Sequence, residues 1–505
     1  MIEHLLAGFA QALTPMVLIY TFVGVCVGTA IGVLPGLGPA ATVGLLLPVT
    51  FGMNPLAAMS MLCGVYYGAQ YGGSTTSILL NVPGESASVI TCLDGHAMAK
   101  KGRAGPALGI SAIGSFIAGI VGTILLLLIG EPLARAALNF GPAEYTVVML
   151  LGLSMATSLG GNQLKAVIMC ILGLLCSTIG TDTFTGGDRF TFGIDQLDQG
   201  IELVPILMGL FALSDILIEI ENGIVPMPDL LKVSTRMRDL LPNREDMKRS
   251  WGPILRGSFG GFFLCTLPGI GAAAASYFSY AAELRISKER EKFGTGMIEG
   301  VAGPESANNS ATSGAMVPLL TLGIPGTATA AVLAGGLMMY GLTPGPLLFR
   351  DNPTFVYGLI ATMFVGNLML IILNLPLISI WIKMVKVPLH ILYPVVIAFV
   401  LLGAYTMNFA LIDVAFLAVF GFLGYFAKKT KMPGAPFILG LFLGPTFEAS
   451  LRRALISSRG SLGIFVNRPI SLAMMVLTVL ILAGPTVIKM IKKKDIQQDE
   501  EDSWI

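Results

Sequence analysis

The sequence has few charged residues. Asp, Glu, Lys and Arg make up only 12% of its 505 residues, whereas 54% are hydrophobic. A soluble globule of this length needs far more polar surface than that. The composition therefore predicts an all-α polytopic membrane protein with about 10–12 transmembrane segments. Apolar runs that approach the roughly 20 residues of a membrane span occur near residues 15–34, 105–130, 144–160, 163–180, 200–222, 354–379, 389–406, 408–427 and 470–488.

Motifs for nucleotide binding and hydrolysis are also missing. The sequence contains no Gly-x4-Gly-Lys-Ser/Thr loop, no Gly-x-Ser-x-Gly elbow and no His-Glu-x-x-His. Its glycine patterns adjoin apolar helices and not a βαβ unit, so they do not indicate a dinucleotide site. The six cysteines lie in apolar runs without paired spacing, and we expect them to be packing residues. We therefore expect no enzyme activity, no cofactor, no metal site and no nucleic-acid partner.

Positive charge is absent from the first 99 residues, which argues against a cleaved signal peptide with a basic start. Basic residues then gather in five places, which the positive-inside rule assigns to the cytoplasm. With these assignments the N-terminus is periplasmic and the C-terminus cytoplasmic. The five clusters are Lys100–Arg103, Lys232–Arg256, Arg285–Lys292, Lys428–Lys431 and Lys489–Lys494.

Two short phrases occur twice in the chain. Leu34-Pro-Gly-Leu-Gly38 returns as Leu267-Pro-Gly-Ile-Gly271, with the prolines 233 residues apart. Asn81-Val-Pro-Gly84 returns as Gly323-Ile-Pro-Gly326, with the prolines 242 residues apart. Pro-Gly cannot continue a regular helix, so each phrase predicts a broken or re-entrant helix. The nearly constant spacing predicts two repeats, and the charge pattern predicts that they are inverted.

We expect four segments from this repetition. They are membrane repeat unit 1 (residues 1–225), a cytoplasmic connecting loop (226–252), membrane repeat unit 2 (253–494) and an acidic C-terminal tail (495–505). The topology of residues 297–342 stays open, because those helices can either cross the membrane or re-enter.

Broken helices offer backbone groups to a ligand inside the membrane. A helix that starts there directs free N–H groups and a positive dipole end at an anion such as a carboxylate. Helix C-termini and neutral side-chain oxygens favour a small cation. The predicted substrate-binding residues are Gly36, Gly38, Ser74, Thr75, Asn81, Pro83, Gly84, Gly269, Gly271, Asn308, Asn309, Pro325 and Gly326, and the predicted cation-binding residues are Ser77, Ser310, Thr312 and Ser313.

Each of these features also has a purely structural interpretation. Gly24, Gly28, Gly32 and Gly36 form a stripe that favours close helix packing over substrate contact. Membrane Ser and Thr residues often only bond to a neighbouring turn or helix. Glu85 and Glu305 follow Pro at predicted breaks, where we expect them to cap helices. Asp188 and Arg189 are expected to pair within an ordered loop over residues 180–193.

Several phrases resemble the large membrane subunit of the tripartite tricarboxylate transporters, the TctA family. They are Leu34–Gly38, Tyr71–Ser74 with Asn81–Glu85, Asp188–Gly193, and Gly303–Asn309 through Leu322–Gly326. The resemblance covers essentially the whole chain, and Gly-Pro-Glu-Ser-Ala-Asn-Asn is its most specific phrase. It implies a bacterial inner-membrane permease that works with a small TctB-like membrane subunit and a periplasmic TctC-like binding protein. It further implies import of citrate or related carboxylates by symport with an ion, usually sodium.

The residues and the resemblance lead to one hypothesis about mechanism. A carboxylate delivered by the binding protein is held by the broken helix ends, and bound cations offset its charge. Citrate carries roughly three charges at pH 7, which could not lie near the bilayer midplane without counter-ions. An elevator-type movement is suggested by analogy with the TRAP transporters, which share the three-part plan. A passive carboxylate channel and an intramembrane enzyme are the alternatives.

Overall fold

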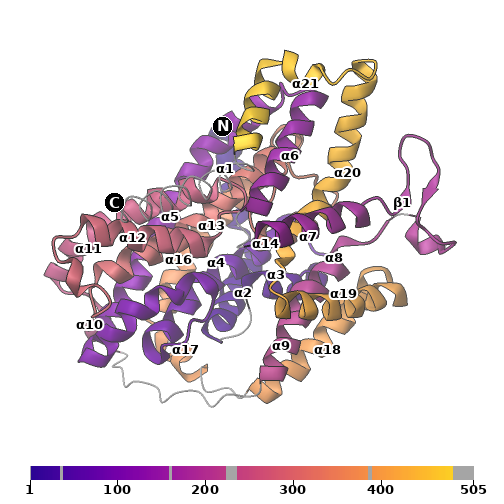
Figure 1. Ribbon diagram of the computed structural model, residues 1–505. Coiled ribbons are helices and arrows are strands. Elements are labelled where there is room, and N and C mark those ends of the chain that lie inside the picture. The colour runs from indigo at the N-terminus through magenta and orange to yellow at the C-terminus, as the bar shows by residue number, and fades with distance from the viewer. Residues whose placement is uncertain are drawn as a thin grey trace, which may run out of the picture. The chain divides into compact units, whose positions relative to one another are not determined.

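The computed structural model describes residues 2–34, 38–158, 162–198, 200–222, 236–384 and 389–480. Within these ranges the chain is helical apart from short connections and one two-stranded hairpin (Figure 1). Six of the described helices are long and apolar enough to cross a membrane, and six shorter apolar helices accompany them. The prediction of an all-α polytopic membrane protein is therefore confirmed.

The chain packs as two compact units, each described here by itself. The first comprises residues 1–138 and 202–430, and the second comprises residues 139–201 and 431–505. These units reflect packing and not internal repetition, so the division into two sequence repeats stays a prediction. The expected acidic tail lies outside the described residues.

The helices of the first unit include the predicted broken segments. They are α1 (Ile2–Ala12), α2 (Pro15–Val33), α3 (Pro39–Leu46), α4 (Pro55–Leu80), α5 (Ala104–Ala137), α8 (Leu203–Leu207), α9 (Ser214–Asn222), α10 (Met237–Leu240), α11 (Arg244–Cys265), α12 (Ala272–Ile286), α13 (Glu299–Leu322), α14 (Ala328–Met339), α15 (Pro346–Asp351), α16 (Pro353–Asn374), α17 (Ile378–Met384), α18 (Leu389–Asn408) and α19 (Leu411–Lys429).

Helix boundaries fall where the repeated phrases predict them. The chain leaves the helical conformation after Val33 and resumes as α3 at Pro39, and it does the same between Cys265 and Ala272. Asn81 ends α4 with a φ of 59°, and Gly323 ends α13 with a φ of 72°. Both residues adopt the left-handed conformation that closes a helix. A break before α3 or α12 and a left-handed residue that ends α4 or α13 therefore occur in the same order in both halves of the first unit, before residue 223 and after residue 235.

The glycine stripe on α2 is a packing surface. A Cβ added at Gly24, Gly28 or Gly32 would lie within 2.5 Å of a backbone oxygen of α4. Only glycine permits the two backbones to approach so closely. This confirms helix packing as the role of these three residues, while Gly36 lies outside the described residues.

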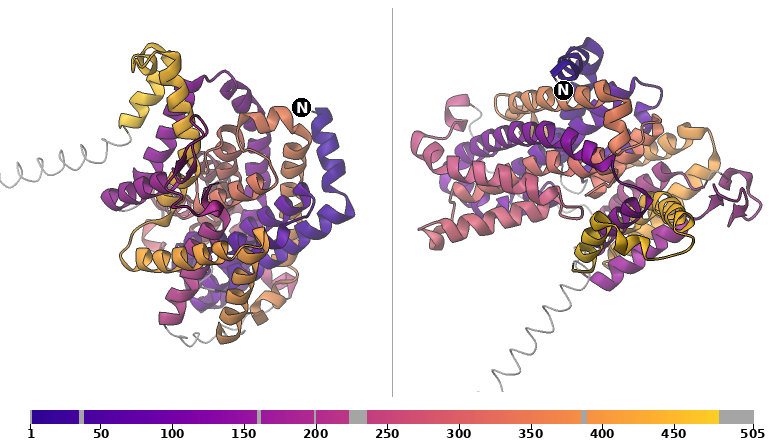
Figure 2. Two further views of the ribbon diagram at one scale, coloured as in Figure 1. Left: turned by 90° about the vertical axis from the view of Figure 1, so that its right-hand side faces the viewer. Right: turned by 90° about the horizontal axis from the view of Figure 1, so that it is seen from above.

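Helices α11 and α13 form an equivalent pair. A Cβ at Gly257 would lie 2.4 Å from the Gly303 oxygen, and one at Gly261 would lie 2.2 Å from the Ala307 oxygen. Each glycine-packed pair also contacts a helix from the other half of the sequence: α5 packs on α11 and α13, and α16 packs on α2 and α4. Helix α1 lies alongside α16, as the views in Figure 2 also show. This arrangement encloses α4 and α13 along nearly their whole length.

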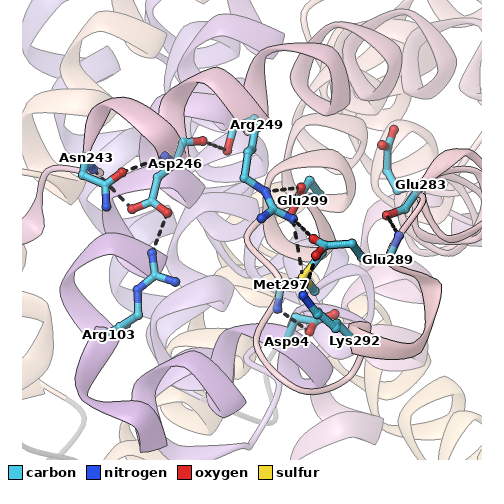
Figure 3. Close-up of polar contacts among 12 residues, drawn as sticks. Asp94, Arg103, Asn243, Asp246, Arg249, Glu283, Glu289, Lys292, Met297 and Glu299 are labelled. Atoms are coloured by element: carbon cyan, nitrogen blue, oxygen red, sulfur yellow. Dashed lines mark hydrogen bonds and ion pairs between the residues drawn. The ribbon is translucent and has the colours of Figure 1, made fainter.

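Charged residues tie the start of α13 to its neighbours (Figure 3). Arg249 on α11 contacts Glu299 at 2.6 Å and Glu289 at 2.7 Å. The buried carboxylate of Asp94 accepts the N–H groups of Gly296 and Met297 at 2.8 and 2.7 Å. A carboxylate in this position satisfies free N–H groups just before the helix and complements its dipole. These residues belong to the regions whose basic clusters predict the cytoplasmic face.

The second unit contains the hairpin. Its elements are α6 (Pro142–Ser158), α7 (Gln163–Cys176), β1 (Gly180–Thr181), β2 (Asp188–Arg189), α20 (Gly434–Ser457) and α21 (Ile464–Asn467), followed by an apolar helix over Pro469–Leu480. Strands β1 and β2 pair antiparallel, with Gly180 opposite Arg189 and Thr181 opposite Asp188. The prediction of an ordered loop here is confirmed.

Ion pairs connect this loop to α20. Arg189 contacts Glu448 at 2.8 Å, and Arg452 donates to both carboxylate oxygens of Asp182 at 2.8 Å. Asp188 instead accepts the Thr181 hydroxyl at 2.9 Å, so the expected pairing of Asp188 with Arg189 was wrong. Side chains of adjacent strand residues point to opposite faces, which separates the two groups.

The environment of Asp182 makes the loop sensitive to acid. The Phe184 N–H, followed by the Arg452 guanidinium, lowers the pKa of Asp182 from its usual 3.8 to about 2. A lowered pKa stabilises the folded loop fully above pH 3.8, and this contribution disappears as the pH falls through about 2. We predict that the protection factors of the loop amides, taken relative to the intrinsic exchange rate at the same pH, fall below pH 3.8 and that Asp182→Asn lowers them several-fold at neutral pH. Hydrogen exchange on the purified protein checks both, with Asp188→Asn as the control; equal exchange in the two variants would contradict the assignment.

Candidate functional site

The two polar clusters of the sequence lie on the enclosed helices α4 and α13. Residues Gln70–Ser77 continue α4 as regular helix, and Gly303–Gly314 form the middle of α13. Both stretches are buried. Ser74 joins them by donating its hydroxyl to the Glu305 carboxylate at 2.6 Å. The structure thus brings together two clusters that are more than 200 residues apart in the chain.

Glu305 lies at the centre of this polar region. Its side chain is fully buried, and it accepts the hydroxyls of Ser74 and Thr91 and the Asn308 amide. No ion pair found among the described residues reaches it. The expectation that Glu305 caps a helix was wrong, because α13 begins at Glu299 and continues through Pro304. A buried carboxylate without a positive partner is costly in a membrane protein and commonly marks a functional site.

Glu85 behaves differently. It precedes the short 3-10 helix over Ser86–Val89, and its Oε2 accepts the Ala87 N–H at 2.7 Å while Ser88 closes a capping box. The predicted capping role of Glu85 is confirmed. Its other oxygen, Oε1, is buried without a hydrogen-bond partner among the described residues.

The paired asparagines hold the next turn of α13 in place. Asn309 donates from Nδ2 to the Ser115 hydroxyl at 2.7 Å and to the Glu305 carbonyl at 3.0 Å, and it also contacts the Asn308 oxygen. These acceptors fix the orientation of the amide. Its oxygen, Oδ1, is buried without a hydrogen-bond partner in the described part of the chain.

A small cavity lies beside Asn309, between α4, α5, α13 and α16. Its volume is about 10 Å³, about what a single water molecule needs. Two of the lining residues belong to the predicted cation-binding set, Thr312 and Ser313. The full lining is Tyr67, Gly119, Thr123, Asn309, Thr312, Ser313, Met363 and Asn367.

The other two predicted cation-binding residues do not line this cavity. Ser77 donates to the Gly73 carbonyl of its own helix at 2.9 Å, and Ser310 donates to the Ser258 carbonyl of α11 at 2.5 Å. Both are hydroxyls that bond to helix backbones, as membrane Ser residues often do.

The predicted substrate-binding glycines fall into two groups. Gly84 and Gly326 are buried, and a Cβ at Gly84 would lie 1.9 Å from the Gly32 oxygen. Gly269 donates to the Gly326 carbonyl at 2.8 Å, so the two breaks of the second half meet. Gly38 and Gly271 are helix N-caps in extended conformation, and a Cβ at either would meet no atom within 4 Å.

The remaining predicted substrate residues surround these breaks. Thr75 is buried within α4, Asn81 is an exposed helix end, Pro83 is partly buried and Pro325 is buried. A larger pocket of about 250 Å³ includes Arg135, Arg350 and Tyr357 but none of the predicted site residues. Sequence reasoning missed six residues outside the repeated phrases: Tyr67 and Tyr71 on α4 itself, Ser115 and Thr123 on α5, Asn367 on α16, and Thr91 in the connection before α5.

The described architecture defines a polytopic membrane protein with a buried, mostly uncharged polar centre beside interrupted helices, a construction found in secondary transporters. The chain belongs to the tripartite tricarboxylate transporter TctA family, whose model matches residues 18–439.

Two relatives from Agrobacterium vitis share extensive sequence with this chain. An uncharacterized 52.8 kDa protein in the TAR-I ttuC' 3'region is 46% identical over 476 residues, which cover 94% of each chain. An uncharacterized protein in the TAR-II ttuC' 3'region is 45% identical over 215 residues, covering 43% of this chain and 89% of the relative. No solved structure matches the chain.

The close approach at Gly84 gives a test of the site's construction. We predict that Gly84→Ala lowers stability by about 1–3 kcal/mol, because its methyl group would overlap the Gly32 carbonyl. Gly44→Ala is the matched control, since its methyl group would meet Val332 at an ordinary 3.8 Å. Melting temperatures of the two purified variants check this. Equal melting temperatures would show that α2 and the Pro83–Gly84 break do not pack as described.

Proposed function

We propose that this protein is the large permease subunit of a binding-protein-dependent secondary transporter that imports tricarboxylates or related carboxylates together with a cation. Its partners are a small membrane subunit and a periplasmic substrate-binding protein, and it resides in the bacterial inner membrane. Family membership supports the tripartite plan. The absence of a nucleotide-binding motif from the sequence agrees with transport driven by an ion gradient.

The observation that carries the proposal is the open space in front of two matching helix starts. Gly38 precedes α3 and Gly271 precedes α12, each at a break of the repeated phrase. The first N–H groups of a helix have no partner within it and favour an anion. A Cβ at either glycine would meet no atom of the described residues within 4 Å, which leaves room there for a ligand to approach the backbone. Each of these helix starts suits a carboxylate group.

The lack of Lys and Arg in the buried polar stretches Gln70–Ser77 and Gly303–Gly314 supports cation coupling. The helix ends supply only partial positive charges, far less than the charge of a tricarboxylate. Burying the remaining charge in the membrane without a counter-ion would be prohibitive. A cation that enters with the substrate offsets this charge and lets its own gradient drive uptake.

The primary experiment is carboxylate uptake into proteoliposomes that contain this chain and its small partner subunit. We expect uptake of labelled citrate, or of another carboxylate from a panel, that requires both the purified binding protein and an inward sodium gradient. Uptake that needs neither and only follows the carboxylate gradient would contradict the proposal and indicate a passive channel.

The helix starts are tested separately from folding. We predict that Gly38→Ala and Gly271→Ala raise the KM for the carboxylate by about tenfold, equivalent to roughly 1.4 kcal/mol of lost binding. Melting temperatures of both variants should match the unmodified protein, because each methyl group enters open space. Unchanged KM values in both would remove the helix starts from the substrate site.

The asparagine pair is tested in the same assay. Asn308→Ala and Asn309→Ala each remove an amide from the buried polar centre, and we predict that uptake or its cation dependence falls by at least about tenfold. Asn374→Ala serves as a control, because that buried amide donates within its own helix, to the Leu370 carbonyl. If both α13 variants transport normally with normal cation dependence, this part of the site is wrong.

A further inference from the structure

The small cavity beside Asn309 has the chemistry of a cation site. Its polar lining groups are neutral: two hydroxyls from Thr123 and Thr312, one from Ser313, one from Tyr67, and the amides of Asn309 and Asn367. Each of these residues is at least nine-tenths buried. Oxygen atoms are the ligands that hard cations prefer. The space admits one water-sized particle, which excludes a hydrated ion and any carboxylate substrate.

Two lining atoms point to a missing ligand. The Tyr67 hydroxyl and the Asn309 Oδ1 are both buried without a hydrogen-bond partner among the described residues. A buried polar atom in this state is expected to have a partner such as an ion or a water molecule. The Asn309 amide cannot simply turn away, because its Nδ2 is already bonded to Ser115 and to Glu305.

Hydrogen bonds around the cavity hold the other ligands in position. Asn367 donates to the Phe116 carbonyl at 2.9 Å and accepts the Tyr71 hydroxyl at 2.9 Å. Thr312 donates to the Asn309 carbonyl at 2.7 Å, and Thr123 donates to the Gly119 carbonyl at 2.7 Å. A hydroxyl that donates its proton to a carbonyl keeps its lone pairs for a cation. The set is therefore rigid and directed before an ion arrives.

Glu305 supplies the charge that a cation needs. Glu305 lies one helical turn before Asn309, and the side-chain amide of Asn309 donates to the backbone carbonyl of Glu305 at 3.0 Å. The Glu305 carboxylate does not line the cavity, since its oxygens accept from Ser74, Thr91 and Asn308, so its charge would act on a cation in the cavity at longer range through the protein. The cation would also balance a charge that has no positive partner in the described residues.

We propose that this cavity binds one dehydrated Na⁺, coordinated by oxygens of Tyr67, Asn309, Thr312 and their neighbours and balanced electrostatically by Glu305. The inference rests on the proposed function, in which Na⁺ enters with the substrate, and assigns the ion to a specific place. Tyr67, Thr123 and Asn367 are thereby candidate Na⁺ ligands, whereas Glu305 would attract the ion through its charge without coordinating it. The lining of the site comes from four helices, α4, α5, α13 and α16.

The test is direct Na⁺ binding by the purified full-length chain in detergent, without substrate. Melting temperature is measured while NaCl replaces choline chloride at constant ionic strength. A ligand that binds only the folded protein raises the melting temperature in a saturable way. We expect this rise in the unmodified protein.

Three variants remove different parts of the site. Thr312→Val removes a cavity hydroxyl, Tyr67→Phe removes an unpartnered one, and Glu305→Gln removes the charge. Each should raise the Na⁺ concentration at the midpoint by at least about tenfold. Thr321→Val is the matched control, because Thr321 lies on the same helix and makes the same kind of backbone bond, to Val317, but does not line the cavity. Its midpoint should stay within about twofold of the unmodified protein.

Each result decides the matter. A melting temperature that responds equally to Na⁺ and choline would show that the cavity holds only water, and so would an unchanged Na⁺ midpoint in Thr312→Val and Tyr67→Phe. Tyr67→Phe keeps the proposal testable if another variant does not fold, since removing an unpartnered hydroxyl should not harm the fold. Uptake assays run in parallel distinguish the Na⁺ site from the proposed function. If the unmodified protein shows sodium-driven uptake and the variants transport as well as it does, the site is wrong and the function stands. If uptake by the unmodified protein requires neither sodium nor the binding protein, the proposed function is wrong.

Discussion

The structure of the first unit depends on direct backbone contact between glycine-containing helices. Helix α2 lies against α4 and α11 lies against α13 so closely that a single added methyl group would meet a carbonyl oxygen. This proximity, together with α5 and α16 on the opposite side, leaves α4 and α13 enclosed by protein. Polar residues on these two helices must then find partners within the protein. The buried network around Glu305 is a consequence of that enclosure.

The equivalent contacts in the two halves support the predicted repetition. Each half has a glycine-packed pair of helices, an interruption before a short helix, and a left-handed residue that ends the enclosed helix. Each half also contributes one helix, α5 or α16, that packs on the pair from the other half. Because each helix pair is covered in part by a helix from the other half, neither half has all of its packing partners within its own sequence. This arrangement also places the cavity among helices from both halves, where a relative movement of the two would alter its lining.

Local chemistry was predictable from the sequence, and long-range pairing was not. The helix ends after Val33 and after Cys265 follow from the proline and glycine of the repeated phrases, and the packing of Gly24, Gly28 and Gly32 follows from their helical spacing. Glu305 was misjudged because Pro304 suggests a helix start, whereas α13 begins five residues earlier and tolerates the proline. Enclosure by other helices overrides the local preference. The partners of Glu305 and Asn309 lie about 190 to 230 residues away, and no spacing rule in a single sequence connects them.

The anion and the cation would bind to different kinds of structure, and this difference has a physical basis. A large carboxylate requires space and several N–H donors, for which the proposed site uses the helix starts at Gly38 and Gly271. A bare cation requires a small, rigid set of oxygens, and hydrogen bonds to backbone carbonyls hold Thr312, Asn367 and Thr123 of the cavity lining in place. Both α4 and α13 line the cavity, and each ends at a break of a repeated phrase, so an ion bound there would act on the two helices that lead into those breaks.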